Sequence, residues 1–278
     1  MRWTTLRRGS STYLAERVDD HYVVYDRPSV SALFAGPTSQ GEVIGHVTLE
    51  EAEYAPLVGE GARVVCVGLN YADHVLEMGR EVPEFPTLFA KFGSALTGPR
   101  DDIAIPSVSE HVDWEAELAI VIAEPAHRVS EIEARSAIGG FTVANDISMR
   151  DWQRRTTQWF AGKSFDSSTP IGPEMVSPTA VDFAEDLEVS CSVDGRVVQQ
   201  GRTSQFIFSP ERVISYVSQF MQWRPGDVLL TGTPGGVGAA NDLRLSVGQT
   251  VETRIEQLGA CVNSMVAGGA SSRGSLGA

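Results

Sequence analysis

The 278-residue sequence lacks features that define several large classes of protein. It has no apolar run near the roughly 18 residues that a helix needs to cross a bilayer. Its basic N-terminal stretch is not followed by the apolar segment of a signal peptide. With 22 basic and 36 acidic residues its formal net charge is −14, which argues against nucleic acid or an anionic membrane as a partner. These absences predict a cytoplasmic protein.

Cysteine is scarce, and the common catalytic signatures are missing. The three cysteines, Cys66, Cys191 and Cys261, lie far apart and form no C-x-x-C pair, which predicts reduced thiols. The sequence contains no G-x-S-x-G, no H-E-x-x-H and no G-x-G-x-x-G after a strand. A serine hydrolase, a zincin and a dinucleotide-dependent oxidoreductase are therefore disfavoured.

What is present predicts a mainly β fold with short helices, in the α+β class. Residues 1–57 are short alternating runs broken by turns, with a hairpin around Asp19-Asp20, and predict a small N-terminal β-rich cap. Residues 58–267 combine buried strand patterns with a few short helices and predict the main domain. Residues 268–278 are small and polar, which predicts a flexible tail.

Two local signals are clear in the second half of the chain. Residues 186–208 predict a β-hairpin with Asp194-Gly195 as its two-residue turn. The segment 209–223 has the spacing of an amphipathic helix, with Ser209 placed to cap it.

Acidic residues interrupt two runs that otherwise have the pattern of buried strands. Glu115 and Glu117 are two apart, so on a strand both face the same side, and Asp146 follows the next apolar run. Three carboxylates from two strand ends suit a hard divalent cation. The alternative is a solvated strand face, and because Asp113 shares that face, spacing leaves open which carboxylates bind.

A short predicted helix near residue 74 carries a second candidate group. His74 and Glu77 are three apart and share a face of that helix, so the carboxylate can orient the imidazole as a general base. Such a pair is also common as a simple surface contact. Gly79, Pro83 and Pro86 bound the segment, as in a mobile lid.

Three basic residues and one threonine are candidates to meet an anion. Lys91 lies in a mostly apolar stretch, so it either reaches solvent or meets an anionic group. Arg150 and Lys163 follow the acidic runs and either bind a substrate carboxylate or neutralise those runs. Thr233 lies in a glycine-rich loop after a buried strand, where the backbone can approach a ligand closely.

Apart from Lys91, whose neighbours Ala90 and Phe92 depart from the Leu-Lys-Pro run common in that family, the candidate residues belong to a set of motifs that occur together in one known family. They are NYADHVLE (70–77), DWEAELA (113–119), NDISMRD (145–151), GKSFD (162–166), PIGP (170–173) and TGTPGGVG (231–238). Over about residues 60–267 this ordered set resembles the fumarylacetoacetate hydrolase family. The resemblance implies a mixed β-sandwich roll, commonly assembled as a homodimer.

The resemblance also implies roles for the candidate residues. One divalent ion per subunit, Mg²⁺ or Mn²⁺, would be held by Glu115, Glu117 and Asp146, which leaves Asp113 out. His74 and Glu77 would form a catalytic dyad on a lid, with Lys163 facing the substrate. The residues expected to bind or line the substrate are Arg150, Thr233 and Lys91.

The function that follows is chemistry on a small anionic 2-oxo acid through an enolate. The first expectation is hydrolytic C–C cleavage of an acylpyruvate or fumarylpyruvate, with His74 and Glu77 activating water. The alternatives are decarboxylation of oxaloacetate and isomerisation or decarboxylation of a 2-hydroxydienedioate, which use the same site. A non-catalytic binding protein is a remote alternative, because all six expected metal and catalytic residues are present.

Overall fold

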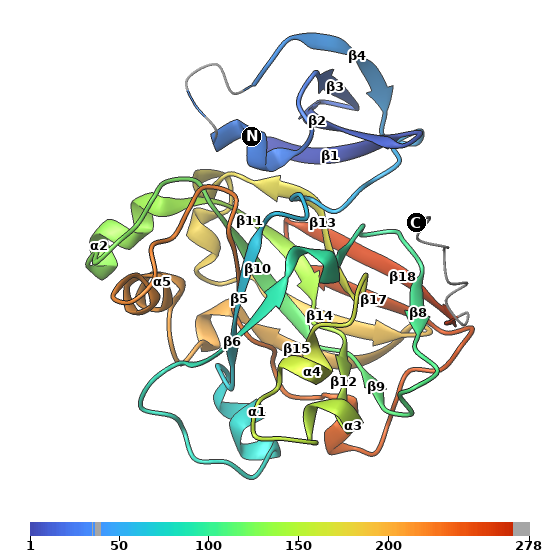
Figure 1. Ribbon diagram of the computed structural model, residues 1–278, viewed down its shortest axis with the longest axis vertical. Helices are drawn as coiled ribbons and strands as arrows, with labels where there is room; N and C mark the ends of the chain where they lie inside the picture. Colours follow the sequence, from blue (N-terminus) through green and yellow to red (C-terminus); the bar gives the residue numbers. More distant parts are fainter. Residues whose placement is uncertain (35, 37–39, 269–278) are drawn as a thin grey trace, which may run out of the picture.

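The computed structural model describes residues 1–34, 36 and 40–268, and most of its elements are strands (Figure 1). The strands are β1 (Arg2–Arg8), β2 (Ser11–Val18), β3 (His21–Tyr25), β4 (Val43–Thr48), β5 (Arg63–Gly68), β6 (Thr87–Phe92), β7 (Leu96–Thr97), β8 (Ile103–Ile105), β9 (Val112–Asp113), β10 (Ala116–Ile122), β11 (Ile138–Asn145), β12 (Ser148–Met149), β13 (Thr169–Val176), β14 (Glu188–Val193), β15 (Arg196–Arg202), β16 (Val228–Leu230), β17 (Thr250–Ile255) and β18 (Gly259–Ala267). The α-helices are α1 (Ala72–Glu77), α2 (Glu131–Ala134), α3 (Arg150–Gln153), α4 (Phe160–Lys163) and α5 (Pro210–Ser218). The 3₁₀ turns are η1 (Val30–Phe34), η2 (Gly93–Ala95), η3 (Arg135–Ala137), η4 (Pro178–Ala180), η5 (Asp182–Ala184), η6 (Thr203–Gln205) and η7 (Gly238–Ala240). The predicted mainly β fold with short helices is confirmed.

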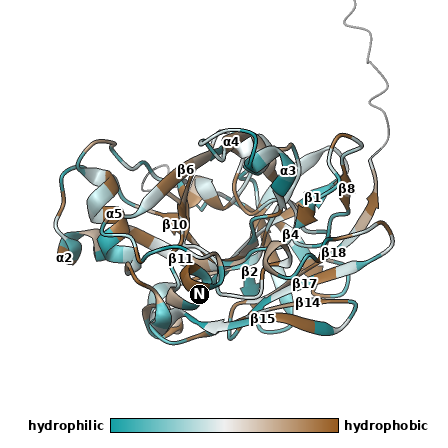
Figure 2. Ribbon diagram, turned by 90° about the horizontal axis from the view of Figure 1, so that it is seen from below, coloured by the Kyte–Doolittle hydropathy of each residue, from teal (hydrophilic) through white to brown (hydrophobic). Residues whose placement is uncertain are grey.

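A large mixed sheet forms the centre of the molecule. Its strand order is β4-β3-β2-β1-β13-β11-β10-β16-β5-β6, and β7 pairs with β13 beside this path. Strands β16 and β5 run parallel, and the other neighbours along the path are antiparallel. Every residue of β10 is buried, as expected of a strand covered on both faces. Figure 2 shows hydrophobic residues along these central strands and hydrophilic ones on the peripheral helix α2.

A second sheet packs against one face of the first. Its order is β15-β14-β17-β18-β8. Leu118 of β10 and Val143 of β11 lie in one hydrophobic cluster with Val189 of β14 and Ile255 of β17. The two sheets thus share a core in the manner of a β-sandwich.

The two predicted hairpins are present. Strands β2 and β3 are joined at Asp19-Asp20, where Val18 pairs with His21. Strands β14 and β15 are joined at Asp194-Gly195, whose φ angles are 50° and 78°. Two consecutive positive φ angles match the turn whose twist suits a two-residue hairpin.

The predicted helix at 209–223 is confirmed at its start and is shorter at its end. The Ser209 side chain accepts a hydrogen bond from a backbone N–H of the first turn, and α5 ends at Ser218. Beyond it the chain turns into the core, where Trp223 is fully buried and its backbone N–H donates to the Ala126 carbonyl at 2.9 Å. Burial of this large side chain explains why the helix stops early.

The N-terminal strands extend the large sheet at the end remote from α1, α3 and α4 (Figure 1). Strand β1 pairs with β13 through Trp3 and Met175. The buried Glu174 of β13 accepts hydrogen bonds from Arg2 at 2.9 Å and from the Tyr22 hydroxyl at 2.6 Å. These contacts fix residues near the N-terminus to the main sheet, and the boundary after residue 57 stays a prediction.

Two further sequence predictions concern the ends and the location of the chain. Of the predicted tail at 268–278, only Gly268 lies within the described residues. In the ranges that the structure describes, no helix is long and apolar enough to cross a membrane. The cytoplasmic location stays a prediction.

Candidate active site

Three carboxylates lie close together where the start of strand β10 pairs with the end of strand β11. Glu117 lies on β10, Glu115 immediately precedes that strand, and Asp146 immediately follows β11. The antiparallel register is continued by a hydrogen bond of 2.8 Å from the Asp146 backbone N–H to the Glu115 carbonyl. All three side chains are buried, and one oxygen from each lies within 4.8 Å of the others. This group can hold a metal ion.

Asp113, which the sequence left as an alternative ligand, points elsewhere. It lies on β9, and its carboxylate accepts from the backbone N–H groups of Gly238 and Ala239 at 2.7 and 3.0 Å. It also accepts from Nε of Arg150 at 2.7 Å. Asp113 therefore fixes the loop after β16 and the arginine beside the carboxylate triad, and it stands outside the group of three.

Three buried cations surround the carboxylate triad of Glu115, Glu117 and Asp146. Lys163 contacts Glu115 and reaches Asp146 at 2.9 Å. Lys91 contacts Asp146 from β6. Arg150 places Nη1 2.6 Å from Glu115. Glu115 and Asp146 are thus each paired with a cationic side chain. Within the described residues Glu117 has no such partner and accepts a hydrogen bond only from the backbone N–H of Gly232, at 2.7 Å.

The carboxylates differ in how readily each holds its charge. Burial raises the pKa of Glu117 well above its ordinary value, and the charges of Asp146 and Glu115 raise it further. Burial alone would also raise the pKa of Glu115, but Lys163 and Arg150 hold it at about 2. A divalent cation bound among the three carboxylates would offset the repulsion between the charge of Glu117 and those of Asp146 and Glu115. An all-oxygen donor set suits Mg²⁺ or Mn²⁺, so these residues fit such an ion.

The predicted dyad is assembled on helix α1. Nδ1 of His74 lies 3.4 Å from Oε2 of Glu77, and His74 is buried. The Glu77 carboxylate also accepts from the backbone N–H of Gly236, at 3.0 Å. One turn earlier, Asp73 accepts from the backbone N–H of Gly235 at 3.3 Å. Two carboxylates on α1 therefore attach this helix to the loop after β16.

A glutamine that the sequence did not indicate positions the threonine of that loop. Nε2 of Gln199 donates to the Thr233 hydroxyl at 2.8 Å and to the Pro234 carbonyl at 2.9 Å. Its Oε1 accepts from the backbone N–H of Ala116 at 2.9 Å. Because the Thr233 oxygen accepts from Gln199, its own proton is available to a ligand. Gln199 lies on a distant strand, so no local spacing could have identified it.

A second glutamine, Gln153, was also missed. Its Oε1 accepts from Nη1 of Arg150 at 3.0 Å. The two residues are three apart on α3, so the spacing that identified the dyad on α1 applies here as well. Nη2 of Arg150 is buried without a hydrogen-bond partner in the described part of the chain. A buried donor of this kind is normally satisfied, and a ligand in the adjoining space would do so.

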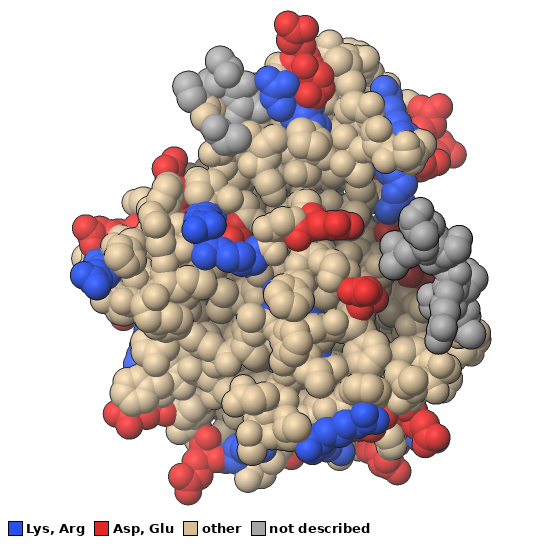
Figure 3. Space-filling view, in the orientation of Figure 1, with Lys and Arg blue, Asp and Glu red and all other residues tan. Residues whose placement is uncertain are grey.

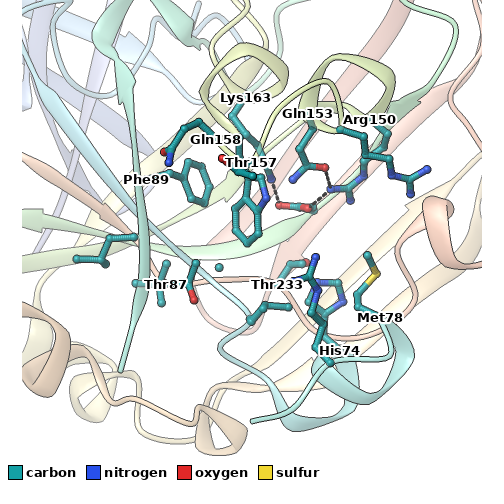
Figure 4. A pocket seen from close by; sticks show the side chains of 18 of the residues that line it. His74, Met78, Thr87, Phe89, Arg150, Gln153, Thr157, Gln158, Lys163 and Thr233 are labelled. Atoms are coloured by element: carbon teal, nitrogen blue, oxygen red, sulfur yellow. Dashed lines mark hydrogen bonds and ion pairs between the residues drawn. The ribbon is translucent and has the colours of Figure 1, made fainter. Parts of the chain in front are cut away.

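A cavity of about 640 Å³ adjoins part of each group: Glu115 and Glu117 of the triad, His74 of the pair, and the cations and polar residues Arg150, Lys163, Gln153 and Thr233. Figure 4 shows Arg150, Gln153 and Lys163 on one side of it, and His74 and Thr233 on the other. The residues that line it are Val67, Gly68, Leu69, His74, Met78, Arg80, Thr87, Leu88, Phe89, Glu115, Glu117, Arg150, Gln153, Arg154, Thr156, Thr157, Gln158, Trp159, Lys163 and Thr233. No described residue of the segment 1–57 is among them.

Lys91 does not lie where a substrate-binding residue was expected. Alternation along β6 turns it inward while Phe92 is exposed. Its ammonium meets the Asp146 carboxylate, and it is not among the residues that line the cavity. Of the two alternatives from the sequence, contact with an anion is the one observed, and the anion is a triad carboxylate. Its position does not support a role in substrate binding.

An aromatic wall closes one side of the cavity. The rings of Phe89 and Trp159 meet edge to face, with centroids 5.6 Å apart. Nζ of Lys163 lies 5.1 Å from the centroid of Phe89. Trp159 also covers the backbone of Gly68, where an added Cβ would lie 2.2 Å from Cζ3 of the indole. The glycine is therefore required for the position of this ring.

Replacing Gly68 with Ala is expected to displace Trp159 and to destabilise the fold by about 1–3 kcal/mol, as overpacking does. Urea unfolding of G68A measures the loss. In a Trp159→Leu background the same change should cost much less, because the clashing ring is gone. An equal cost in both backgrounds would mean that Gly68 serves another purpose.

Comparison with known proteins identifies the chain's relatives. The family described as fumarylacetoacetate (FAA) hydrolase C-terminal matches residues 63–266. A mitochondrial oxaloacetate tautomerase of Homo sapiens is 45% identical over 208 residues, which are 73% of this chain and 66% of the relative. A mitochondrial oxaloacetate tautomerase of Xenopus laevis is 42% identical over 208 residues, 73% of this chain and 65% of the relative. The chain thus spans just under two thirds of these relatives.

Solved structures extend the similarity over nearly the whole chain. A fumarylacetoacetate hydrolase from Exiguobacterium antarcticum superposes with a TM-score of 0.85 at 28% identity, covering 96% of this chain and 100% of that one. A 2-hydroxyhepta-2,4-diene-1,7-dioate isomerase from Mycobacterium marinum has a TM-score of 0.80 at 31% identity, with 97% and 99% covered. The resemblance seen in the motifs is confirmed: the chain belongs to the fumarylacetoacetate hydrolase family.

Proposed function

We propose that the chain is a metal-dependent enzyme that moves a proton at the carbon next to the keto group of a 2-oxo acid. The observation that carries this proposal is one cavity lined both by Glu115 and Glu117 of the buried carboxylate triad and by His74, which is paired with Glu77. Glu115, Glu117 and Asp146 would hold Mg²⁺ or Mn²⁺. When bound, such an ion supplies Lewis-acid stabilisation of negative charge on the substrate oxygens.

The substrate's carboxylate would be held by groups that have free donors. Nη2 of Arg150 is buried and unsatisfied within the described residues, and the Thr233 hydroxyl can donate because Gln199 already donates to its oxygen. Charge-assisted hydrogen bonds of this kind orient a carboxylate strongly. Arg150, Thr233 and His74 line one cavity. A substrate whose carboxylate is held by the first two therefore has few orientations of its keto group relative to His74.

His74 is the residue placed to carry the proton. With Nδ1 donating to Glu77, its Nε2 keeps a lone pair and can accept a proton from C3 of the substrate. The electron pair of that C–H bond moves toward the keto oxygen. The charges of Asp146 and Glu115 raise the pKa of Lys163 although burial alone would lower it, so Lys163 stays an ammonium and stabilises the developing negative charge. Return of the proton to the oxygen completes a keto–enol tautomerisation, and the reverse path reforms the ketone.

This proposal favours proton transfer over the C–C hydrolysis that the sequence first suggested. The human and Xenopus relatives are named oxaloacetate tautomerases. Hydrolysis of an acylpyruvate is the second candidate, and the same His74–Glu77 pair supports it, because Nε2 can equally take a proton from water. Decarboxylation of oxaloacetate and isomerisation of a dienedioate use the same groups. An assembly of two chains, as the family resemblance implies, is also proposed.

The test follows two reactions side by side in Mg²⁺ buffer. Keto–enol interconversion of oxaloacetate is monitored by the absorbance of the enol, and pyruvate release is measured from acetylpyruvate. We expect the interconversion to be accelerated at least about 100-fold over buffer, as a positioned base provides, and to fall to the buffer rate with EDTA. Rapid pyruvate release with no effect on oxaloacetate would move the protein to the hydrolases. A rate indifferent to EDTA would contradict the metal requirement.

A further inference from the structure

Two arginines that line the cavity take no part in the proton transfer or carboxylate binding proposed above. Arg80 and Arg154 are both exposed, and neither side chain has a hydrogen bond or an ion pair within the described residues. The other two cations of the lining, Arg150 and Lys163, are buried against Glu115. The free positive charge of the cavity therefore belongs to Arg80 and Arg154.

The backbone of each arginine is fixed by a helix end. Arg154 follows α3, and its backbone N–H donates to the Arg150 carbonyl at 3.1 Å, so it lies one turn beyond the arginine that contacts Glu115. Arg80 lies just beyond α1, after Gly79 with its φ of 63°, and its backbone N–H donates to the Val75 carbonyl at 3.0 Å. The helix that carries His74 and the helix that carries Arg150 are thus each followed by an arginine that lines the same cavity.

The charge of the lining is opposite to that of the whole protein. The chain has 36 acidic and 22 basic residues, and acidic side chains appear in several places around the face seen in Figure 3. Among the residues that the structure describes, by contrast, four Lys or Arg residues line the cavity and two acidic ones do, both of them in the triad. A metal ion in the triad adds further positive charge. Such a cavity attracts a ligand with more than one negative group.

We propose that Arg80 and Arg154 bind a second carboxylate at the far end of the substrate, and so select dicarboxylic 2-oxo acids over those with a neutral end. This inference rests on the proposed function, because it presumes that the keto end lies at the triad. The space is sufficient: at roughly 30 Å³ per heavy atom, as for liquid water, the nine heavy atoms of oxaloacetate take up about 270 Å³ of the 640 Å³ cavity.

The test compares ligands that differ only at the far end. Calorimetry in Mg²⁺ buffer measures the Kd of 2-oxoglutarate and of 2-oxovalerate, which has the same five carbons without the distal carboxylate. Oxalate, which has only the chelating end, reports the triad alone. We expect the wild type to bind 2-oxoglutarate at least about tenfold more tightly than 2-oxovalerate, as two charged hydrogen bonds provide.

In the double variant R80Q/R154Q this preference should disappear while the Kd of oxalate is unchanged. Both side chains are exposed and unpartnered among the described residues, so the thermal midpoint should also be unchanged. The matched control is Arg196→Gln, on the exposed turn end of β15 and outside the cavity lining, which should keep the wild-type preference. The wild-type preference should also shrink as salt is raised.

The outcomes separate this inference from the proposed function. If none of the three ligands binds the wild type, the proposed function fails and the inference fails with it. If oxalate binds but the wild type shows no preference for 2-oxoglutarate, or if R80Q/R154Q keeps that preference, the inference is overturned and the proposed function stands.

Discussion

Replacing Glu117 with Gln is expected to lower turnover by at least about 10³-fold while leaving the metal-free fold as stable as the wild type or more so. The activity falls because the triad loses a ligand, and a bound metal supplies several kcal/mol of transition-state stabilisation. The fold is kept because the Gln oxygen can still accept from the Gly232 N–H. The substitution does not lower the stability, because it removes a negative charge that burial and two neighbouring carboxylates oppose.

Activity assays with saturating Mg²⁺ and urea unfolding in EDTA measure the two effects of E117Q. The informative comparison is Asp146→Asn, which removes another ligand but also leaves the ammonium of Lys91 buried without a carboxylate partner. Breaking a buried pair in this way costs about 3–5 kcal/mol. Both variants should lose activity, but only D146N should lose stability. Equal losses of stability in E117Q and D146N would contradict the view that Glu117, unlike Asp146, has no cationic partner in the metal-free protein.

Replacing His74 with Gln is expected to lower kcat by about 10²–10⁴-fold with metal affinity unchanged, because the imidazole moves the proton and lies outside the carboxylate group. Turnover and Mn²⁺ affinity of H74Q measure the two properties. Parallel loss of both would mean that His74 is a metal ligand and that the proton carrier is another residue.

The partner of His74 needs its own control, since Glu77 both contacts the imidazole and holds α1 to Gly236. Asp73→Asn weakens the neighbouring attachment of α1, to Gly235, without touching the imidazole. If Glu77 acts by orienting His74, E77Q should lower kcat well below the level of D73N. If the two variants behave alike, the role of Glu77 is to hold the helix.

Local features of the fold were predictable, and pairing between distant strands was not. The turns at Asp19-Asp20 and Asp194-Gly195 and the cap at Ser209 depend on a few adjacent residues, and all three are present. The pairing of β1 with β13 joins segments more than 170 residues apart. Nothing in either sequence segment specifies that partner, because a strand's pattern gives its buried face and not its neighbour.

The candidate site shows the same division. The spacing of Glu115 and Glu117 placed them together, but it also allowed Asp113. The direction of Asp113 follows from contacts with distant residues, the backbone N–H groups of Gly238 and Ala239 and the Arg150 side chain. For Lys91 the sequence correctly gave contact with an anion as one of two alternatives, yet it could not show that the anion belongs to the protein. A buried lysine needs a compensating charge, and the fold decides whether a carboxylate of the protein supplies it. The local sequence around Lys91 does not contain that information.

The most direct measurement of the central claim is calorimetric titration of Mn²⁺ into the wild-type protein and E117Q, without and with oxalate. We expect one ion per wild-type chain, tighter binding when oxalate is present, and little or no binding by E117Q. Stoichiometric binding that is the same in E117Q as in the wild type, or Mn²⁺ binding that oxalate does not strengthen, would contradict a metal site at the buried triad where 2-oxo acids bind.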